Sequence, residues 1–129
     1  MKSRCAIGAA CVLVIALILC TGCGRKLPPL PPGMPDPVEL VSAGFEENEV
    51  VVKARCNVPG STITLLGKPK GLCPSCTDDL MRKDEAFVEE AGTVHLRDTA
   101  PDASYMVYRI AFSKGTLVWM TDARVVRRR

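Results

Sequence analysis

Six of the ten prolines in this chain fall between Gly24 and Pro37. Proline lacks a backbone N–H and fixes φ near −65°, so this stretch forms neither a helix nor a central strand. We expect an extended spacer of the polyproline type, which rises about 3.1 Å per residue and would reach about 40 Å. The fold must therefore be built after Pro37. The 129 residues leave room there for one ordinary domain, which excludes a multidomain enzyme.

The amino-terminal block has the order of a secretory signal. Lys2 and Arg4 precede Ala6–Cys20, an apolar run without a charged residue. The apolar centre of a signal peptide is typically 7–15 residues long, whereas a membrane-spanning helix needs about 20 apolar residues. We therefore expect a signal helix in residues 1–22. An uncleaved apolar anchor is the alternative, and it would leave the protein on the same membrane.

The sequence Cys-Thr-Gly-Cys-Gly over residues 20–24 resembles a bacterial lipobox. The resemblance implies cleavage in front of Cys23 and attachment of lipid to its thiol. Modification of Cys20 is the alternative, but it would put Leu19 where a small side chain is required. Gly24 stands where lipoproteins retained in the inner membrane often carry Asp, so the outer membrane is favoured. Residues 23–37 would then be a lipidated, proline-rich tether in the periplasm.

The charge balance argues against nucleic-acid binding. Cleavage would remove two of the 17 basic residues and none of the 14 acidic ones, leaving one more base than acid. Binding to nucleic acid normally needs a clustered basic face. For the terminal Arg127-Arg128-Arg129, with Arg124 nearby, we favour a frayed basic tail over a contact with lipid phosphates or an acidic partner.

Alternating hydrophobicity predicts strands in the rest of the chain. In Glu49–Cys56 every second residue, from Val50 to Cys56, is apolar and predicted to face inward. In Tyr105–Phe112 the inward set is Met106, Tyr108, Ile110 and Phe112, which leaves Arg109 facing water. Shorter strands are predicted over Thr62–Leu66, Ala86–Glu89, Thr93–Leu96, Thr116–Met120 and Ala123–Arg127. Only Asp78–Glu90 has spacing that also permits a helix. Short strands separated by turns predict an all-β fold, a β-sandwich over residues 38–127.

A family resemblance supports this fold. Asp98-Thr99, Pro101, the strand Tyr105–Ile110 and the turn at Gly115 are similar to the second half of a fibronectin type III domain. The resemblance implies an immunoglobulin-like sandwich in which Tyr105 or Tyr108 serves as the corner tyrosine. A lipidated domain of this type, with a proline-rich tether and a Cys-Pro-x-Cys insertion, resembles small lipoproteins of sulfate-reducing and related bacteria.

Three cysteines would remain after cleavage and lipidation: Cys56, Cys73 and Cys76. An oxidising compartment favours a disulfide, and Cys73 and Cys76 are the closest pair. So short a loop limits the stabilisation to about 2 kcal/mol. Cys56, at an inward strand position, is then expected to be a small buried hydrophobic residue.

Two alternatives give these cysteines a chemical role. A thioredoxin-like pair would need Cys73 and Cys76 at the start of a helix after a strand. A structural zinc site would need Cys56, Cys73, Cys76 and His95, of which only the Cys-x2-Cys half has metal-site spacing. We therefore expect no metal and no cofactor.

No catalytic residues are predicted. The only histidine is His95, and no Gly-x-Ser-x-Gly motif or glycine-rich phosphate loop occurs. The acidic pairs Asp78-Asp79, Glu46-Glu47 and Glu89-Glu90 are expected to be solvated charges in turns.

The sequence therefore favours a non-enzymatic binding or structural module in the bacterial cell envelope. It would be held to the membrane by the lipid on Cys23 and would bind an unidentified envelope protein. The first alternative is a thiol–disulfide or metal-handling lipoprotein that uses Cys73 and Cys76. The second is an accessory subunit of an outer-membrane assembly machine, suggested by the Cys-Gly-Arg-Lys start of the mature chain.

Overall fold

The computed structural model describes residues 35–71, 73–74 and 76–129. The predicted signal peptide, the lipidation of Cys23 and most of the predicted tether lie outside the described residues. The strands are β1 (Val38–Glu46), β2 (Glu49–Cys56), β3 (Ser61–Pro69), β4 (Met81–Val88), β5 (Gly92–Asp98), β6 (Tyr105–Lys114), β7 (Leu117–Met120) and β8 (Arg124–Arg127). This part of the chain contains no helix long and apolar enough to cross a membrane.

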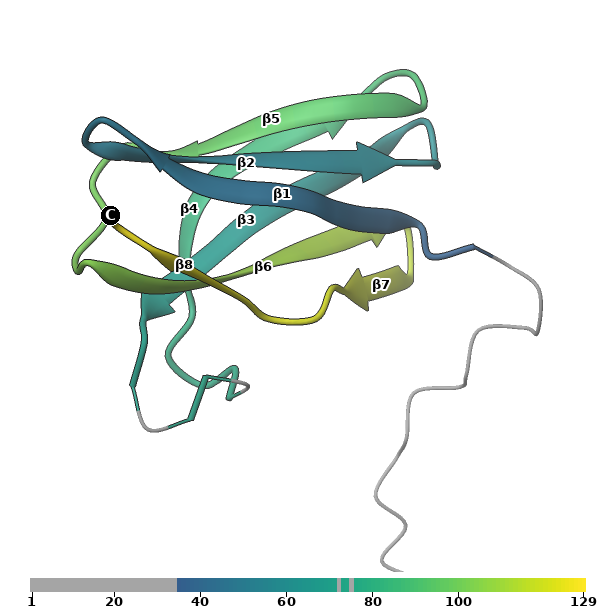
Figure 1. Cartoon of the computed structure of the whole chain (residues 1–129). Helices are drawn as coiled ribbons and strands as arrows, with labels where there is room; N and C mark the ends of the chain where they lie inside the picture. The colour runs from purple at the N-terminus through teal and green to yellow at the C-terminus, as the bar shows by residue number, and fades with distance from the viewer. Residues whose placement is uncertain (1–34, 72, 75) are drawn as a thin grey trace, which may run out of the picture. The chain divides into compact units, whose positions relative to one another are not determined.

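The strands form two antiparallel sheets (Figure 1). The smaller sheet has the order β1-β2-β5. The larger sheet has the order β4-β3-β6, and both β7 and β8 pair with the remaining edge of β6. The all-β prediction is confirmed, and two facing antiparallel sheets are the arrangement of a β-sandwich.

The core lies between the sheets and follows the predicted alternation. In β2 the inward residues Val50, Val52, Ala54 and Cys56 have no exposed surface. The inward set of β6, from Met106 to Phe112, is equally buried and belongs to the same cluster. These two strands were predicted correctly because each has a neighbour on both sides, which gives its inward side chains a continuous apolar environment.

Strand β1 was not predicted. Its pairing with β2 shifts by one residue between Leu40 and Ser42. A bulge of this kind interrupts the period-two pattern. Val38 and Leu40 before the shift are buried, and Ala43 and Phe45 after it pack against the core.

The helical alternative for Asp78–Glu90 is wrong, because residues 81–88 form strand β4. Strand β4 is an edge strand that pairs only with β3. Its pairing shifts where Leu65 faces Asp84 and Leu66 faces Arg82, so Lys83 is an extra residue. The predicted short strand Ala86–Glu89 overlaps only the end of β4, because this bulge and the exposed polar side chains of an edge strand hide the alternation in the rest of it.

Candidate functional site

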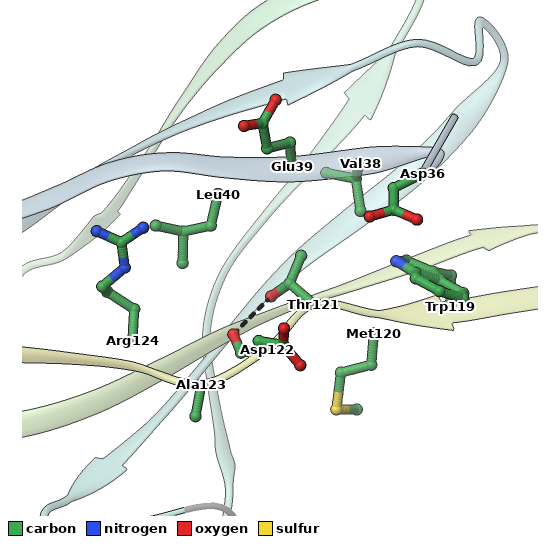
Figure 2. A pocket seen from close by; sticks show the side chains of 10 residues that line it. All are labelled: Asp36, Val38, Glu39, Leu40, Trp119, Met120, Thr121, Asp122, Ala123 and Arg124. Carbon is green, nitrogen blue, oxygen red and sulfur yellow. Dashed lines mark hydrogen bonds between the residues drawn. The ribbon is translucent and has the colours of Figure 1, made fainter. Parts of the chain in front are cut away.

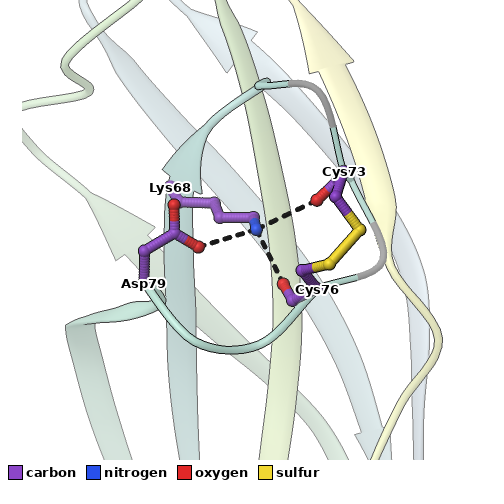
Figure 3. The surroundings of a disulfide bond; sticks show 4 residues. All are labelled: Lys68, Cys73, Cys76 and Asp79. Carbon is purple, nitrogen blue, oxygen red and sulfur yellow. Dashed lines mark hydrogen bonds and ion pairs between the residues drawn. A yellow bond between two sulfur atoms is a disulfide. The ribbon is translucent and has the colours of Figure 1, made fainter.

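The candidate site is the connection between β3 and β4, closed by a disulfide between Cys73 and Cys76 (Figure 3). We call the described residues 70–71, 73–74 and 76–80 the disulfide loop. The two cysteine Cα atoms are 5.4 Å apart, and the Cys76 amide donates a hydrogen bond to the Cys73 carbonyl oxygen at 3.2 Å. A second turn follows, in which the Leu80 amide donates to the Thr77 carbonyl oxygen at 3.4 Å. Both turns bond within the loop itself.

Lys68 is a buried cation that holds the disulfide loop. Its side chain is 4% exposed. Its Nζ donates to the carbonyl oxygens of Cys73 at 3.1 Å and Cys76 at 2.7 Å, and to Asp79 Oδ1 at 2.7 Å (Figure 3). An ammonium group has three N–H donors, so every donor has an acceptor. The hydrogen bond from Lys68 holds the pKa of the Asp79 carboxyl below its usual value.

The disulfide loop lies over the outer face of the larger sheet. Lys68 pairs across the strands with Val107, which is fully buried. Val107 alternates with the core residues Met106 and Tyr108 and is not part of the core cluster. It therefore faces away from the core, on the side where Lys68 meets the loop. Lys68 therefore connects the loop to the outer face of this sheet.

The burial of Lys68 was not predicted, and Asp79 has more than the predicted role of a solvated turn charge. Asp79 is exposed, as expected of a solvated turn residue, but it is also the ionic partner of Lys68. A lysine next to Pro69 at a strand end carries no signal of burial. The only hint is that it lies in the same short stretch as Cys73 and Cys76.

The hypothetical zinc ligands are not brought together. Cys56 is buried in the core, where its Sγ lies 3.4 Å from Ser61 Oγ. His95 is exposed on β5 of the smaller sheet, opposite Lys53 of β2. The disulfide loop contacts the outer face of the other sheet. Among the described residues, no group of three or more His, Cys, Asp or Glu side chains is placed to hold a metal ion.

A buried polar network lies around Asp98, which is 3% exposed. The hydroxyl of Tyr108 donates to Asp98 Oδ2 at 2.8 Å. Lys83 Nζ lies 3.7 Å from the same oxygen and 3.1 Å from Asp102. Burial, followed by the hydrogen bond to Asp98, raises the pKa of the Tyr108 hydroxyl far above its usual value. The tyrosine therefore remains a neutral donor, and the network ties β4, β5 and β6 together.

A groove opens between the start of β1 and the segment that joins β7 to β8 (Figure 2). It encloses about 320 Å³. Its lining residues are Asp36, Val38, Glu39, Leu40, Trp119, Met120, Thr121, Asp122, Ala123 and Arg124. The groove exists because β7 ends at Met120 and β8 begins only at Arg124.

Thr121 replaces strand pairing at this break. Its amide donates to the Ile110 carbonyl oxygen at 3.0 Å, and its Oγ1 accepts the Ile110 amide at 3.0 Å. Arg109, predicted to face water, is instead half-buried, and its Nη1 donates to the Thr121 carbonyl oxygen at 3.4 Å.

The frayed tail is wrong for Arg127 and Arg128, and the strand predicted over Ala123–Arg127 is present as β8. Arg127 belongs to β8 and pairs with Tyr105 of β6. The Arg128 amide donates to the Ser104 carbonyl oxygen at 2.8 Å, and its guanidinium lies 4.9 Å from the centre of the Phe45 ring. Backbone pairing and aromatic contacts therefore hold Arg127 and Arg128 in place.

Comparisons with protein-family models, with curated proteins and with solved structures found no match.

Proposed function

We propose that this chain is a lipid-anchored module of the bacterial cell envelope that binds a partner protein and has no catalytic activity of its own. The observation that carries the binding role is the disulfide loop, held by a covalent link and by the buried Lys68. Recognition residues commonly lie on loops that a rigid scaffold positions. A loop fixed before binding loses less conformational entropy when the partner arrives.

A fibronectin type III-like domain is the finer fold assignment that we propose. Strand β4 pairs with β3 in the larger sheet and does not belong to the β1-β2-β5 sheet. This strand order is similar to that of the family. Tyr108, on the sixth strand, hydrogen-bonds back to Asp98 ten residues upstream. A corner tyrosine also bonds to a group upstream of it, usually in the backbone. Tyr105 faces outward and is 43% exposed, which favours Tyr108 for this role.

The membrane anchor rests on the lipobox-like residues 20–24. An acyl chain contributes about 0.8 kcal/mol per buried methylene, so more than one chain on Cys23 would make attachment effectively permanent. Metabolic labelling with palmitate tests this. The full chain should incorporate label and sediment with the membranes, and Cys23→Ser should abolish labelling. Cys20→Ser is the matched control and should remain labelled, whereas an unlabelled wild-type chain would contradict lipidation.

Crosslinking in intact cells tests the binding role. A photoreactive amino acid replaces Asp78, which is exposed in the disulfide loop, and in a second strain replaces Lys53, which is exposed on the smaller sheet. We expect one discrete protein adduct from position 78 and none of the same mass from position 53. Equal adducts from both positions, or none from position 78, would contradict binding through the loop.

Thiol–disulfide exchange is the second candidate, favoured by the position of Lys68. Its ammonium group bonds to the carbonyl oxygens of both cysteines, and a nearby cation stabilises a thiolate after reduction. Mass spectrometry of the purified protein under graded glutathione ratios separates the two functions. A binding module should keep its disulfide across a reducing series that opens an exchange-active pair.

A further inference from the structure

The carboxyl-terminal strand brings two cations to an exposed tyrosine. Tyr105 pairs with Arg127 on one side, and on the other its carbonyl oxygen accepts the Lys70 amide at 2.9 Å. Lys70 Nζ lies 5.7 Å and the Arg127 guanidinium carbon 5.4 Å from the centre of the Tyr105 ring. Cations at these distances are attracted by the ring and hold it in one orientation.

These side chains share the outer face of the larger sheet with the disulfide loop. Tyr105 and Val107 are two residues apart on β6, so both face away from the core. Val125 of β8 pairs with Val107 across the strands and lies on the same face, where it is 43% exposed. We call Lys70, Tyr105, Val125 and Arg127 the cation–tyrosine patch. Lys70 is also the first residue of the disulfide loop, so the patch and the loop form one continuous surface.

The charges of the patch are not neutralised within the described residues. Five other cations have an acidic partner: Arg55 pairs with Glu39, Arg82 with Glu85 and Arg97 with Glu49, and Lys68 and Lys83 pair with aspartates. Among the residues described, neither Lys70 nor Arg127 lies within 4 Å of a carboxylate oxygen, and Arg128 and Arg129 follow on the same chain end.

We propose that the cation–tyrosine patch is the docking surface for an acidic segment of the partner protein; this inference rests on the proposed binding function. Arg and Tyr are, with Trp, the residue types enriched among those that contribute most of the binding energy at protein interfaces. The planar guanidinium of Arg127 matches a carboxylate, while Tyr105 and Val125 offer apolar contact beside it. An anionic membrane is the weaker fit, because the exposed carboxylate of Asp78 in the adjoining loop would repel a uniformly negative surface.

The test is crosslinking from position 125 in cells that produce the full chain. Replacing Val125 with a photoreactive amino acid leaves Lys70, Tyr105 and Arg127 intact. We expect a protein adduct whose crosslinked peptide, mapped by mass spectrometry, lies within an Asp- or Glu-rich segment. Lys70→Glu combined with Arg127→Glu should lower the adduct yield about tenfold, equivalent to the loss of one strong contact. Lys53→Glu, the same charge reversal on the smaller sheet, should leave it unchanged.

Other outcomes overturn the proposal. A phospholipid adduct would assign the patch to the membrane. A protein adduct insensitive to the two charge reversals, one mapped to a segment without acidic residues, or no adduct at all would exclude an acidic docking segment. The adduct from position 78 keeps the two proposals apart. If it persists while position 125 fails, the binding function stands and the patch inference falls; if both positions fail, both fall.

Discussion

Gly67 and Lys68 are neighbours on β3 that serve opposite faces of the larger sheet. Gly67 lies opposite Tyr108, on the core side, and the absence of a side chain there makes room for the tyrosine ring. Lys68 lies opposite Val107 on the outer side and holds the disulfide loop. Because strand residues alternate between faces, a one-residue shift of β3 would turn Lys68 toward the core and Gly67 toward the disulfide loop.

Gly67→Ala should destabilise the protein by about 1–3 kcal/mol, the usual cost of inserting an atom into a packed core. A Cβ at this position would lie 2.7 Å from Tyr108 Cε1 and 2.9 Å from Cδ1, so the ring would have to move away from its bond to Asp98. Denaturant midpoints measure the loss. Gly44→Ala on β1, where a Cβ meets nothing within 4 Å, is the matched control and should be nearly neutral. Equal effects at both positions would contradict the steric argument.

Lys68→Met should cost about 1–3 kcal/mol, because it leaves two carbonyl oxygens and a carboxylate without their donor while keeping most of the aliphatic volume. The loop should also become more accessible, so dithiothreitol should reduce the Cys73–Cys76 bond faster. Lys53→Met, an exposed lysine on β2, is the control and should change neither quantity. An unchanged reduction rate in Lys68→Met would show that the lysine does not hold the loop.

The same ion pair predicts a pH dependence. Lys68 lowers the pKa of Asp79 below its usual value of 3.8. A carboxyl whose folded pKa is depressed stabilises the fold above its unfolded pKa, and this contribution is lost as pH falls through the folded pKa. Wild type should therefore be more stable than Asp79→Asn at neutral pH, and the gap should close as the pH falls below 3.8. Chemical unfolding of wild type and Asp79→Asn at neutral pH and in acid measures the difference in stability. A difference that widened in acid would contradict the lowered pKa of Asp79.

At the scale of elements, the bulges explain which strands the sequence predicts well and which it does not. Strands β2 and β6 are uninterrupted, and their alternation was sufficient to place the core. Strands β1 and β4 each contain a register shift that breaks the pattern. The bulge in β4 has a structural use, because the extra residue Lys83 reaches Asp98 and the next residue, Asp84, accepts the Arg97 amide of β5 at 2.8 Å. These partners are distant in the chain, so spacing alone could not indicate them.

In the candidate site, too, one feature could be predicted from the sequence and the others could not. The proximity of Cys73 and Cys76 was sufficient to predict their pairing. The contacts of Lys68 and the Lys70–Tyr105–Arg127 row depend on how β3, β6 and β8 lie side by side. Strand register is a property of the folded sheet, and a sequence without a clear alternation does not determine it.

Thr121→Val should destabilise the break between β7 and β8 by about 1–3 kcal/mol, because it keeps the side-chain shape but leaves the buried Ile110 amide without an acceptor. Hydrogen exchange at the Ile110 amide should accelerate accordingly. Thr93→Val on the exposed side of β5 is the control and should stay within about 0.5 kcal/mol of wild type. Full protection of Ile110 in Thr121→Val would mean that another acceptor replaces the hydroxyl.

At the scale of the whole molecule, the sheets and the disulfide loop are separate sources of order. One apolar cluster between the sheets includes residues of β1 to β6 and β8. The disulfide loop contributes no residue to this cluster and contacts the outer face of the larger sheet through Lys68. The domain should therefore remain folded when the loop is released.

Replacing both Cys73 and Cys76 with serine tests this separation. The loss of stability should be no more than about 2 kcal/mol, the loop-closure limit for so few residues, and circular dichroism should still show an all-β protein. Combining the change with Lys68→Met should cost less than the two losses added together, because both constraints act on the same loop and releasing one weakens the other. Thermal unfolding of wild type, the double serine variant, Lys68→Met and the triple variant measures this coupling. Strict additivity would mean that Lys68 and the disulfide act on different parts of the structure, and loss of the β-sheet signal would mean that the loop supports the core after all.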